Sequence, residues 1–220
     1  ASDLILLDDN FATIRNAIAG GRRIFLNLRK FVNYLLTCNL AEVLVVLASS
    51  LFFPFILLSP SQILWINLST DGLPALALAS DPAPPDVMKR KPRKVEIVDK
   101  KLLLLIASIG VELALLVLGV FFLLLPLGLE KARTSLFTAF VAYELVRIAA
   151  IRYGEHEFEA KYWLKNKFLI CSLFLSLILQ LLLLYSPLAH AFKVVALGAY
   201  EWLVIAIGAA IGFFASVATA

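Results

Sequence analysis

The sequence is divided into apolar runs that are each long enough to cross a lipid bilayer. About 20 mainly apolar residues span the hydrocarbon core as an α-helix. Of the 220 residues, 61% are hydrophobic, whereas a soluble domain of this size would be about half apolar. We therefore predict an all-α, multi-pass integral membrane protein with six transmembrane helices, at about 31–53, 62–80, 102–125, 134–151, 168–185 and 201–219.

Basic residues gather on alternate connections between these runs. The basic side has Arg22, Arg23, Arg29 and Lys30 before the first span, Lys89, Arg90, Lys91, Arg93, Lys94, Lys100 and Lys101 after the second, and Arg152, Lys161, Lys165 and Lys167 after the fourth. The other connections hold only Lys131, Arg133 and Lys193. The positive-inside rule then predicts that both termini are cytoplasmic, although it does not distinguish the plasma membrane from the endoplasmic reticulum. Because each basic run adjoins a span, we expect lipid headgroups as its partner and no nucleic acid.

The N-terminal segment has a different character from the rest of the chain. Residues 4–7 read as a short buried strand, and Asp8-Asp9-Asn10 supplies a helix N-cap. We expect residues 1–25 to be the end of a cytoplasmic domain with a stalk helix, and residues 26–220 to be a transmembrane domain. The Pro-rich, charged segment 81–94 is expected to form an ordered, non-helical cytoplasmic loop.

The second apolar run carries polar residues and helix breakers at its centre. Asn67, Thr70 and Asp71 are spaced i, i+3 and i+4, so all three can project from one helix face. A charged side chain at mid-bilayer costs about 2.5–3.5 kcal/mol on insertion scales and usually marks a site or a pathway. Pro74 lacks the N–H that would bond the carbonyl four residues earlier, and Gly72 makes unwinding easier. We therefore predict a helix break at Gly72 and Pro74, with an unwound backbone near Thr70–Pro74.

Acidic residues also lie near the centres of other spans. Glu42, Glu112 and Glu144 lie at a depth similar to that of Asp71, and Asn39 shares a helix face with Glu42. Carboxylate, amide and hydroxyl oxygens in this number suit Ca²⁺, which takes six to eight oxygen ligands. The competing interpretation is that these groups only hydrogen-bond the helices to one another, at about 0.6 kcal/mol each.

Four further residues in the spans call for separate interpretations. Cys38 and Cys171 have no paired spacing and are expected to be small buried hydrophobes that do not lie with these oxygens. Glu112 has no clustered partner in its own span, so structural pairing and a functional role both stay open. Arg147 is three residues after Glu144, and we expect the two to pair; the alternative is that Arg147 extends to the headgroups.

Two long stretches of the sequence resemble one known family. The stretches "DLILLDDNFATIRNAIAGGRRIFLNLRKFVNYLLTCNLAEVLVV" and "ILWINLSTDGLPALALASDPAPPDVMKRKPR" resemble the carboxyl-terminal half of type II P-type ATPases, above all the sarco/endoplasmic reticulum calcium pumps and their microbial relatives. The resemblance covers essentially the whole chain and is strongest over residues 1–94. It implies helices five to ten of a ten-helix pump, preceded by a short remnant of the phosphorylation domain.

The resemblance also implies a set of functional residues. The cation ligands would be Asn39, Glu42, Asn67, Thr70, Asp71 and Glu144, and the transported ion would be Ca²⁺. Segment 81–94 would couple the phosphorylation domain to the membrane. Arg147 departs from the family pattern; if it pairs with Glu144, we expect one Ca²⁺ per cycle in place of two.

The catalytic machinery of that family does not occur in this sequence. No phosphorylated-aspartate motif, nucleotide-binding motif or other catalytic constellation is present, so we assign no catalytic residue. ATP and Mg²⁺ would be bound only by the missing N-terminal half, which is the expected partner. We expect the chain to be a fragment without ATPase activity of its own, namely the ion-binding half of an ATP-driven pump that exports Ca²⁺ from the cytoplasm. A pump for Mn²⁺, Na⁺ or H⁺, and a stand-alone membrane protein that binds or regulates a partner pump, stay open as alternatives.

Overall fold

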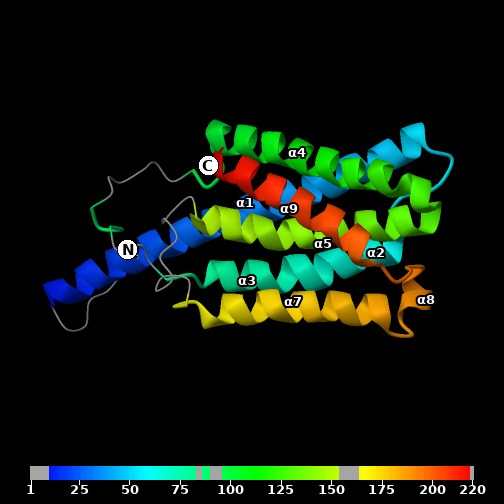
Figure 1. Cartoon of the computed structure of the whole chain (residues 1–220). Helices are drawn as coiled ribbons and strands as arrows, with labels where there is room; N and C mark the ends of the chain where they lie inside the picture. The colour runs from blue at the N-terminus through cyan, green and yellow to red at the C-terminus, as the bar shows by residue number, and fades with distance from the viewer. Residues whose placement is uncertain (1–9, 83–85, 90–95, 154–163, 219–220) are drawn as a thin grey trace.

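The protein is a bundle of helices in which each pass of the chain along the bundle runs opposite to the one before (Figure 1). The computed structural model describes residues 10–82, 86–89, 96–153 and 164–218. The predicted strand at 4–7, Asp8, Asp9 and most of segment 81–94 lie outside these residues. The helical elements are α1 (Phe11–Phe52), α2 (Pro60–Trp65), η1 (Ile66–Gly72), α3 (Leu73–Ala79), α4 (Lys100–Leu124), η2 (Leu125–Leu127), α5 (Leu129–Tyr153), α7 (Lys167–Tyr185), α8 (Ala189–Phe192) and α9 (Ala199–Ala218).

Five helical stretches of the described chain are long and apolar enough to cross a membrane. They are α1, α4 with η2, α5, α7 and α9. The remaining predicted span, 62–80, is covered by three short consecutive elements, α2, η1 and α3. The beginning of α1 and the end of α9 lie toward the same end of the bundle (Figure 1).

Helix α1 is a single helix that extends well beyond the bundle. Asn10 caps it by accepting a hydrogen bond from the Ala12 N–H at 2.9 Å. Its 42 residues correspond to about 63 Å at ~1.5 Å per residue, roughly twice the ~30 Å hydrocarbon core of a bilayer. Near the bundle, the Arg22 side chain donates to the Val87 carbonyl, and Asn27 Nδ2 donates to the Asp81 carbonyl at 2.7 Å. These contacts hold α1 against the segment that follows α3.

The prediction of an unwound backbone near Thr70–Pro74 is wrong, although the α-helix is interrupted there. The α-helix changes instead into a π-helix over Ile66–Gly72 and then resumes as α3, with Gly72 and Pro74 at the junction. In an α-helix the N–H of residue 74 would bond the Thr70 carbonyl, and in a π-helix it would bond the Ser69 carbonyl. Pro74 has no N–H, so it can bond neither of them. Neighbouring helices supply donors in its place: Tyr34 Oη bonds the Thr70 carbonyl, and Ser176 Oγ bonds the Ser69 carbonyl. These donors satisfy the two carbonyls that Pro74 leaves without a partner, and the backbone is helical on both sides of the junction.

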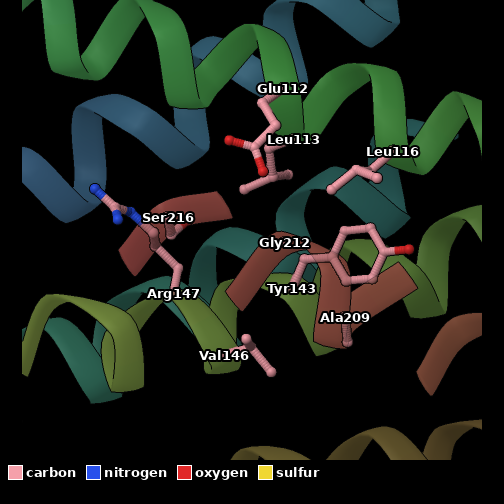
Figure 2. Close-up of a pocket in the computed structure, with 9 residues that line it drawn as sticks. All are labelled: Glu112, Leu113, Leu116, Tyr143, Val146, Arg147, Ala209, Gly212 and Ser216. Atoms are coloured by element: carbon pink, nitrogen blue, oxygen red, sulfur yellow. The ribbon is translucent and has the colours of Figure 1, made fainter. Parts of the chain in front are cut away.

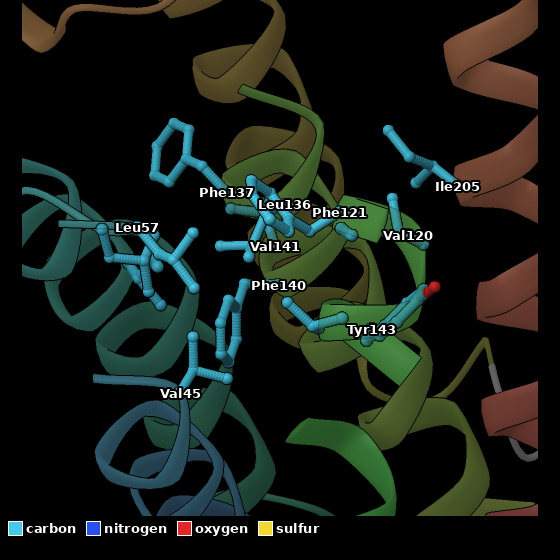
Figure 3. Packing of buried hydrophobic residues seen from close by; sticks show 14 of the residues in the cluster. Val45, Leu57, Val120, Phe121, Leu136, Phe137, Phe140, Val141, Tyr143 and Ile205 are labelled. Carbon is cyan, nitrogen blue, oxygen red and sulfur yellow. The ribbon is translucent and has the colours of Figure 1, made fainter. Parts of the chain in front are cut away.

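Helix α5 is the central element of the bundle. It packs against α4, α9, α7 and η1, and it is the most buried of the five candidate spans. Phe121, Phe137 and Phe140 lie in the core together with Val45 and Leu57 (Figure 3). On its other side α5 approaches α9 closely, because a Cβ at Gly208 would collide with the buried Tyr143 ring. These contacts fix where α5 presents its polar residues.

Basic residues that were expected to face lipid headgroups are partly buried in a charge cluster. Lys30 Nζ lies 3.1 Å from Asp81 Oδ2, and Arg152 Nη2 lies 3.1 Å from Asp81 Oδ1. Asn166 Nδ2 donates to the same carboxylate at 2.8 Å. Asp81 and Arg152 are fully buried. The cluster connects α1, the end of α3, α5 and the start of α7, so the expectation of headgroup contact is wrong for Lys30 and Arg152.

Candidate cation site

Two of the predicted ligands form a pair between α1 and η1. Asn67 Nδ2 donates to both carboxylate oxygens of Glu42, at 3.0 and 3.2 Å, and also to the Ile63 carbonyl at 3.0 Å. Both amide hydrogens of Asn67 are therefore used, which leaves its carbonyl oxygen as an acceptor. Glu42 is buried, with 5% of its surface exposed.

A second pair joins η1 to α5. Thr70 Oγ1 lies 2.7 Å from Glu144 Oε2 and 2.7 Å from the Ile66 carbonyl. The other carboxylate oxygen, Glu144 Oε1, is buried and has no hydrogen-bond partner. Tyr34 holds the backbone at the same place through its bond to the Thr70 carbonyl. Thr70 and Glu144 are both fully buried.

Asp71 lies in the same region and is the least satisfied of the acids. It is 2% exposed, and neither of its carboxylate oxygens has a hydrogen-bond partner. One oxygen of Asp71, one oxygen of Glu144 and Cys38 Sγ all lie within 4.8 Å of one another. A buried carboxylate that has neither a donor nor a counter-charge is costly. Binding of a cation or a proton by Asp71 would therefore remove this cost.

Cys38 is the residue of this region that the sequence did not indicate. The expectation that neither cysteine lies with the acidic oxygens is wrong for Cys38, which is buried beside Asp71 and Glu144. Cys171 is exposed on α7. The one available signal was that Cys38 precedes Glu42 by four residues and so shares its helix face.

Asn39 does not join the pairs described above. Its Nδ2 donates to the Leu35 carbonyl of its own helix at 2.8 Å. The side chain is half-buried, and it would have to rotate away from that carbonyl to present its oxygen to an ion. Its assignment as a ligand stays a prediction.

Arg147 does not behave as the sequence suggested. Its Nη2 donates to Asn33 Oδ1 at 3.4 Å, while its Nε and Nη1 are buried without a partner. Among the described residues it forms no ion pair with Glu144, and at 2% exposure it does not extend to the surface either. Both expectations, pairing with Glu144 and extension to the headgroups, are wrong.

Arg147 and Glu112 instead line a small cavity between α4, α5 and α9 (Figure 2). The cavity volume is about 10 Å³, which is room for about one water molecule. Leu113, Tyr143, Val146 and the small α9 residues Ala209, Gly212 and Ser216 complete most of its wall. Among the described residues, Glu112 thus lines this cavity and does not belong to the group formed by Cys38, Asp71 and Glu144.

The arrangement as a whole brings acidic oxygens from three separated parts of the chain to one buried place. Glu42 comes from α1, Asp71 from η1 and Glu144 from α5. Thr70 Oγ1 lies beside Glu144, and the side-chain amide of Asn67 lies beside Glu42 through its nitrogen. Hard oxygen ligands of this kind suit a cation such as Ca²⁺.

Comparison with known proteins agrees with this chemistry. The family described as "Cation transporting ATPase, C-terminus" matches residues 55–219. The "Calcium-transporting ATPase" of Bacillus subtilis (strain 168) is 39% identical over 211 residues, which cover 93% of this chain and 24% of that protein. "Calcium-transporting ATPase 1" of Bacillus cereus is 34% identical over 223 residues, covering 92% of this chain and 25% of that protein. "Calcium-transporting ATPase 2, endoplasmic reticulum-type" of Arabidopsis thaliana is 41% identical over 126 residues, covering 56% of this chain and 12% of that protein.

This chain thus spans about a quarter of the length of these two bacterial relatives. The family match covers most of the chain, including all the described helices after α1. The chain therefore belongs to the P-type cation-transporting ATPases, and it corresponds to their carboxyl-terminal membrane region.

Proposed function

We propose that this chain is the ion-binding membrane half of an ATP-driven Ca²⁺ pump that exports Ca²⁺ from the cytoplasm. The observation that carries the proposal is the pair of Asp71 carboxylate oxygens, buried without a hydrogen-bond partner beside Glu144 and Thr70. Ca²⁺ binding to them would offset the cost of burying the charge. The names of the related proteins support Ca²⁺ as the transported ion.

The proposed transport half crosses the membrane six times. The run α2–η1–α3 occupies Pro60–Ala79, so its 20 residues match the ~20 residues needed for one crossing. The alternation of helix directions supports this count (Figure 1). Both ends of the chain then lie on the cytoplasmic side, which the placement of the basic residues supports.

ATP hydrolysis belongs to the remainder of the pump in this proposal. ATP and Mg²⁺ would act on cytoplasmic domains joined to the N-terminal end of α1, and residues 1–25 would be the end of those domains. The length of α1 supports a stalk that transmits their movement to Glu42, because one continuous helix joins Phe11 to that residue. Segment 81–94 would be a second coupling point, and the bonds from Arg22 to Val87 and Met88 support its attachment to the stalk.

The test is the Ca²⁺ dependence of phosphorylation by ATP in the natural full-length protein. We expect Asp71→Asn to abolish Ca²⁺-dependent phosphoenzyme formation, because it removes the charge that has no other partner. Glu42→Gln should weaken it severely. Glu130→Gln is the matched control, since Glu130 is exposed in the first turn of α5 and its loss should leave the Ca²⁺ dependence unchanged. Unaltered Ca²⁺ dependence in Asp71→Asn would refute the assignment of the site.

A further inference from the structure

The cation site contains a thiol that a Ca²⁺ pump does not need. Cys38 is fully buried and free of any disulfide. Its Sγ, an oxygen of Asp71 and an oxygen of Glu144 lie within 4.8 Å of one another. Both oxygens of Asp71 and one of Glu144 are buried without a partner. The sulfur thus lies beside groups that are themselves available to bind a metal ion.

The three atoms are close enough for rotations of their side chains to bring them around one metal ion. Zinc binds thiolate sulfur at about 2.3 Å and carboxylate oxygen at about 2.0–2.2 Å, so the ligand atoms of a tetrahedral site lie about 3.4–3.6 Å apart. All three atoms lie within 4.8 Å of one another, so they must approach one another by at most about 1.4 Å. Thr70 Oγ1, at 2.7 Å from Glu144 Oε2, is a neutral oxygen next to the same atoms.

The ligand types favour a softer cation than Ca²⁺. Ca²⁺ takes hard oxygen ligands, whereas thiolate sulfur selects soft and borderline metals. We propose that Cys38, Asp71 and Glu144 form a site for a thiophilic divalent cation such as Cd²⁺ or Zn²⁺, which competes with Ca²⁺. This inference rests on the proposed function only in taking Asp71 and Glu144 as cation ligands.

Occupation of this site would involve both a bond and a proton. The metal ion forms a bond to Cys38 Sγ, and the thiol proton leaves to solvent, so the sulfur enters the site as a thiolate. Asp71 and Glu144 supply the remaining negative charge. No electron transfer is involved. Because the two carboxylates are shared, an ion held by Cys38 excludes Ca²⁺ from them.

The test uses the natural full-length protein, purified in detergent, with Cd²⁺ as the probe. A Cd²⁺–thiolate bond gives an ultraviolet charge-transfer band that carboxylate ligands do not give. Wild type is compared with Cys38→Ser, which is nearly isosteric, and with Cys171→Ser, which removes an exposed thiol on α7. Radiolabelled Ca²⁺ binding is measured for all three proteins.

We expect Cys38→Ser to lose the band contributed by this site and to bind Cd²⁺ at least about ten-fold more weakly. Cys171→Ser should match the wild type in both Cd²⁺ and Ca²⁺ binding, and Cys38→Ser should lose much more Cd²⁺ affinity than Ca²⁺ affinity, because Ca²⁺ relies on oxygen ligands. A Cys38→Ser protein that keeps the band and the Cd²⁺ affinity overturns the proposal. A wild type that binds Ca²⁺ but shows no Cd²⁺–thiolate band overturns it as well.

The two proposals can fail separately in this experiment. A band that depends on Cys38 in a protein that does not bind Ca²⁺ supports the thiol site and refutes the proposed Ca²⁺ function. If Cys38→Ser does not fold, Cys38→Ala is compared in its place, and Ca²⁺ competition is measured on the wild type. Saturating Ca²⁺ should remove the Cys38 band, and a band that persists while Ca²⁺ is bound contradicts a shared site.

Discussion

At the scale of single residues, the buried carboxylates differ in how well the protein satisfies them. Glu42 accepts hydrogen bonds from Asn67 on both oxygens, and Glu144 has Thr70 beside one oxygen. Asp71 has no donor for either oxygen. An unsatisfied buried polar group costs about 1–3 kcal/mol, so Asp71 gains most from coordinating a cation. We therefore expect substitution of Asp71 to reduce Ca²⁺ binding more than substitution of Glu42 or Glu144.

The positive charge of Arg147 is expected to weaken Ca²⁺ binding by electrostatic repulsion. Two charges about 10 Å apart repel by about 1–2 kcal/mol at an effective dielectric constant of about 20. Because Arg147 is buried and not neutralised by Glu144, we expect Arg147→Met to raise Ca²⁺ affinity about ten-fold. The measurement is equilibrium binding of radiolabelled Ca²⁺ to the full-length protein.

The matched control for Arg147→Met is Arg133→Met. Arg133 lies near the opposite end of α5, 14 residues from Arg147, which is about 21 Å along the helix, so its replacement should leave Ca²⁺ affinity unchanged. A lower affinity in Arg147→Met would contradict the view that its charge opposes the ion. The pairing on which the expectation of one Ca²⁺ per cycle depended is not seen, and stoichiometry measured in the same experiment tests that expectation directly.

Helical spacing predicted which residues lie near one another within one helix, but not which side chains contact one another between helices. Spacing along the chain predicted that Asn67, Thr70 and Asp71 lie near one another, since residues three and four apart share a face of an α-helix, but in the π-helix η1 they have different neighbours. The contacts of Glu42 with Asn67, and of Glu144 with Thr70, depend on how the helices pack. Cys38 was missed for the same reason, because its neighbours Asp71 and Glu144 belong to other helices.

At the scale of elements, the π-helix η1 is the feature that gives the site its shape. Such segments are often found at functional sites, and here one carries both Thr70 and Asp71. The sequence predicted an interruption because Pro74 lacks an N–H. It could not predict that Tyr34 and Ser176 would donate to the two carbonyls that lose their partner. Those donors come from α1 and α7, so the form of the break is a tertiary effect.

Replacing Pro74 tests the role of this element. Pro74→Ala restores an N–H that can bond the Thr70 carbonyl, which favours an ordinary α-helix over η1 and turns Asp71 away from its present position. We expect unchanged or higher thermal stability, since proline costs about 3 kcal/mol in a helix interior, together with at least about ten-fold weaker Ca²⁺ binding.

Pro60→Ala is the control for this change. Pro60 occupies the first turn of α2, where its missing N–H has no helical partner, so the variant should keep both stability and Ca²⁺ affinity. If Pro74→Ala bound Ca²⁺ as well as the wild type, the π-helix would be irrelevant to the site.

At the scale of the whole molecule, the buried charge cluster around Asp81 joins segments that are distant in sequence. Lys30, Arg152 and Asn166 approach one carboxylate from α1, α5 and the start of α7. The placement of charges along the sequence predicted only that one side of the membrane is basic. It could not predict that Lys30 and Arg152 pair with Asp81, because that pairing depends on how the helices pack. By contrast, α4, α5, α7 and α9 and their approximate bounds were predictable, since the length of each apolar run fixes them.

Asp81→Asn should therefore destabilise the bundle. The variant removes the anion that Lys30 and Arg152 share, and breaking a buried ion pair costs about 3–5 kcal/mol. The measurement is thermal unfolding of the full-length protein in detergent. Arg29→Ala is the control, because Arg29 and Asp99 form a pair with side chains 20% and 32% exposed, and such pairs contribute about 1 kcal/mol or less. Equal losses in the two variants would contradict a special role for the cluster.

The most direct test of the central claim is a structure of the natural full-length protein determined by electron cryo-microscopy in saturating Ca²⁺. The account predicts density for an ion at about 2.3–2.6 Å from oxygens of Asp71 and Glu144, with η1 still π-helical and Arg147 outside the coordination shell. No ion at these carboxylates under conditions in which the protein binds Ca²⁺, or the guanidinium of Arg147 in its place, would contradict it.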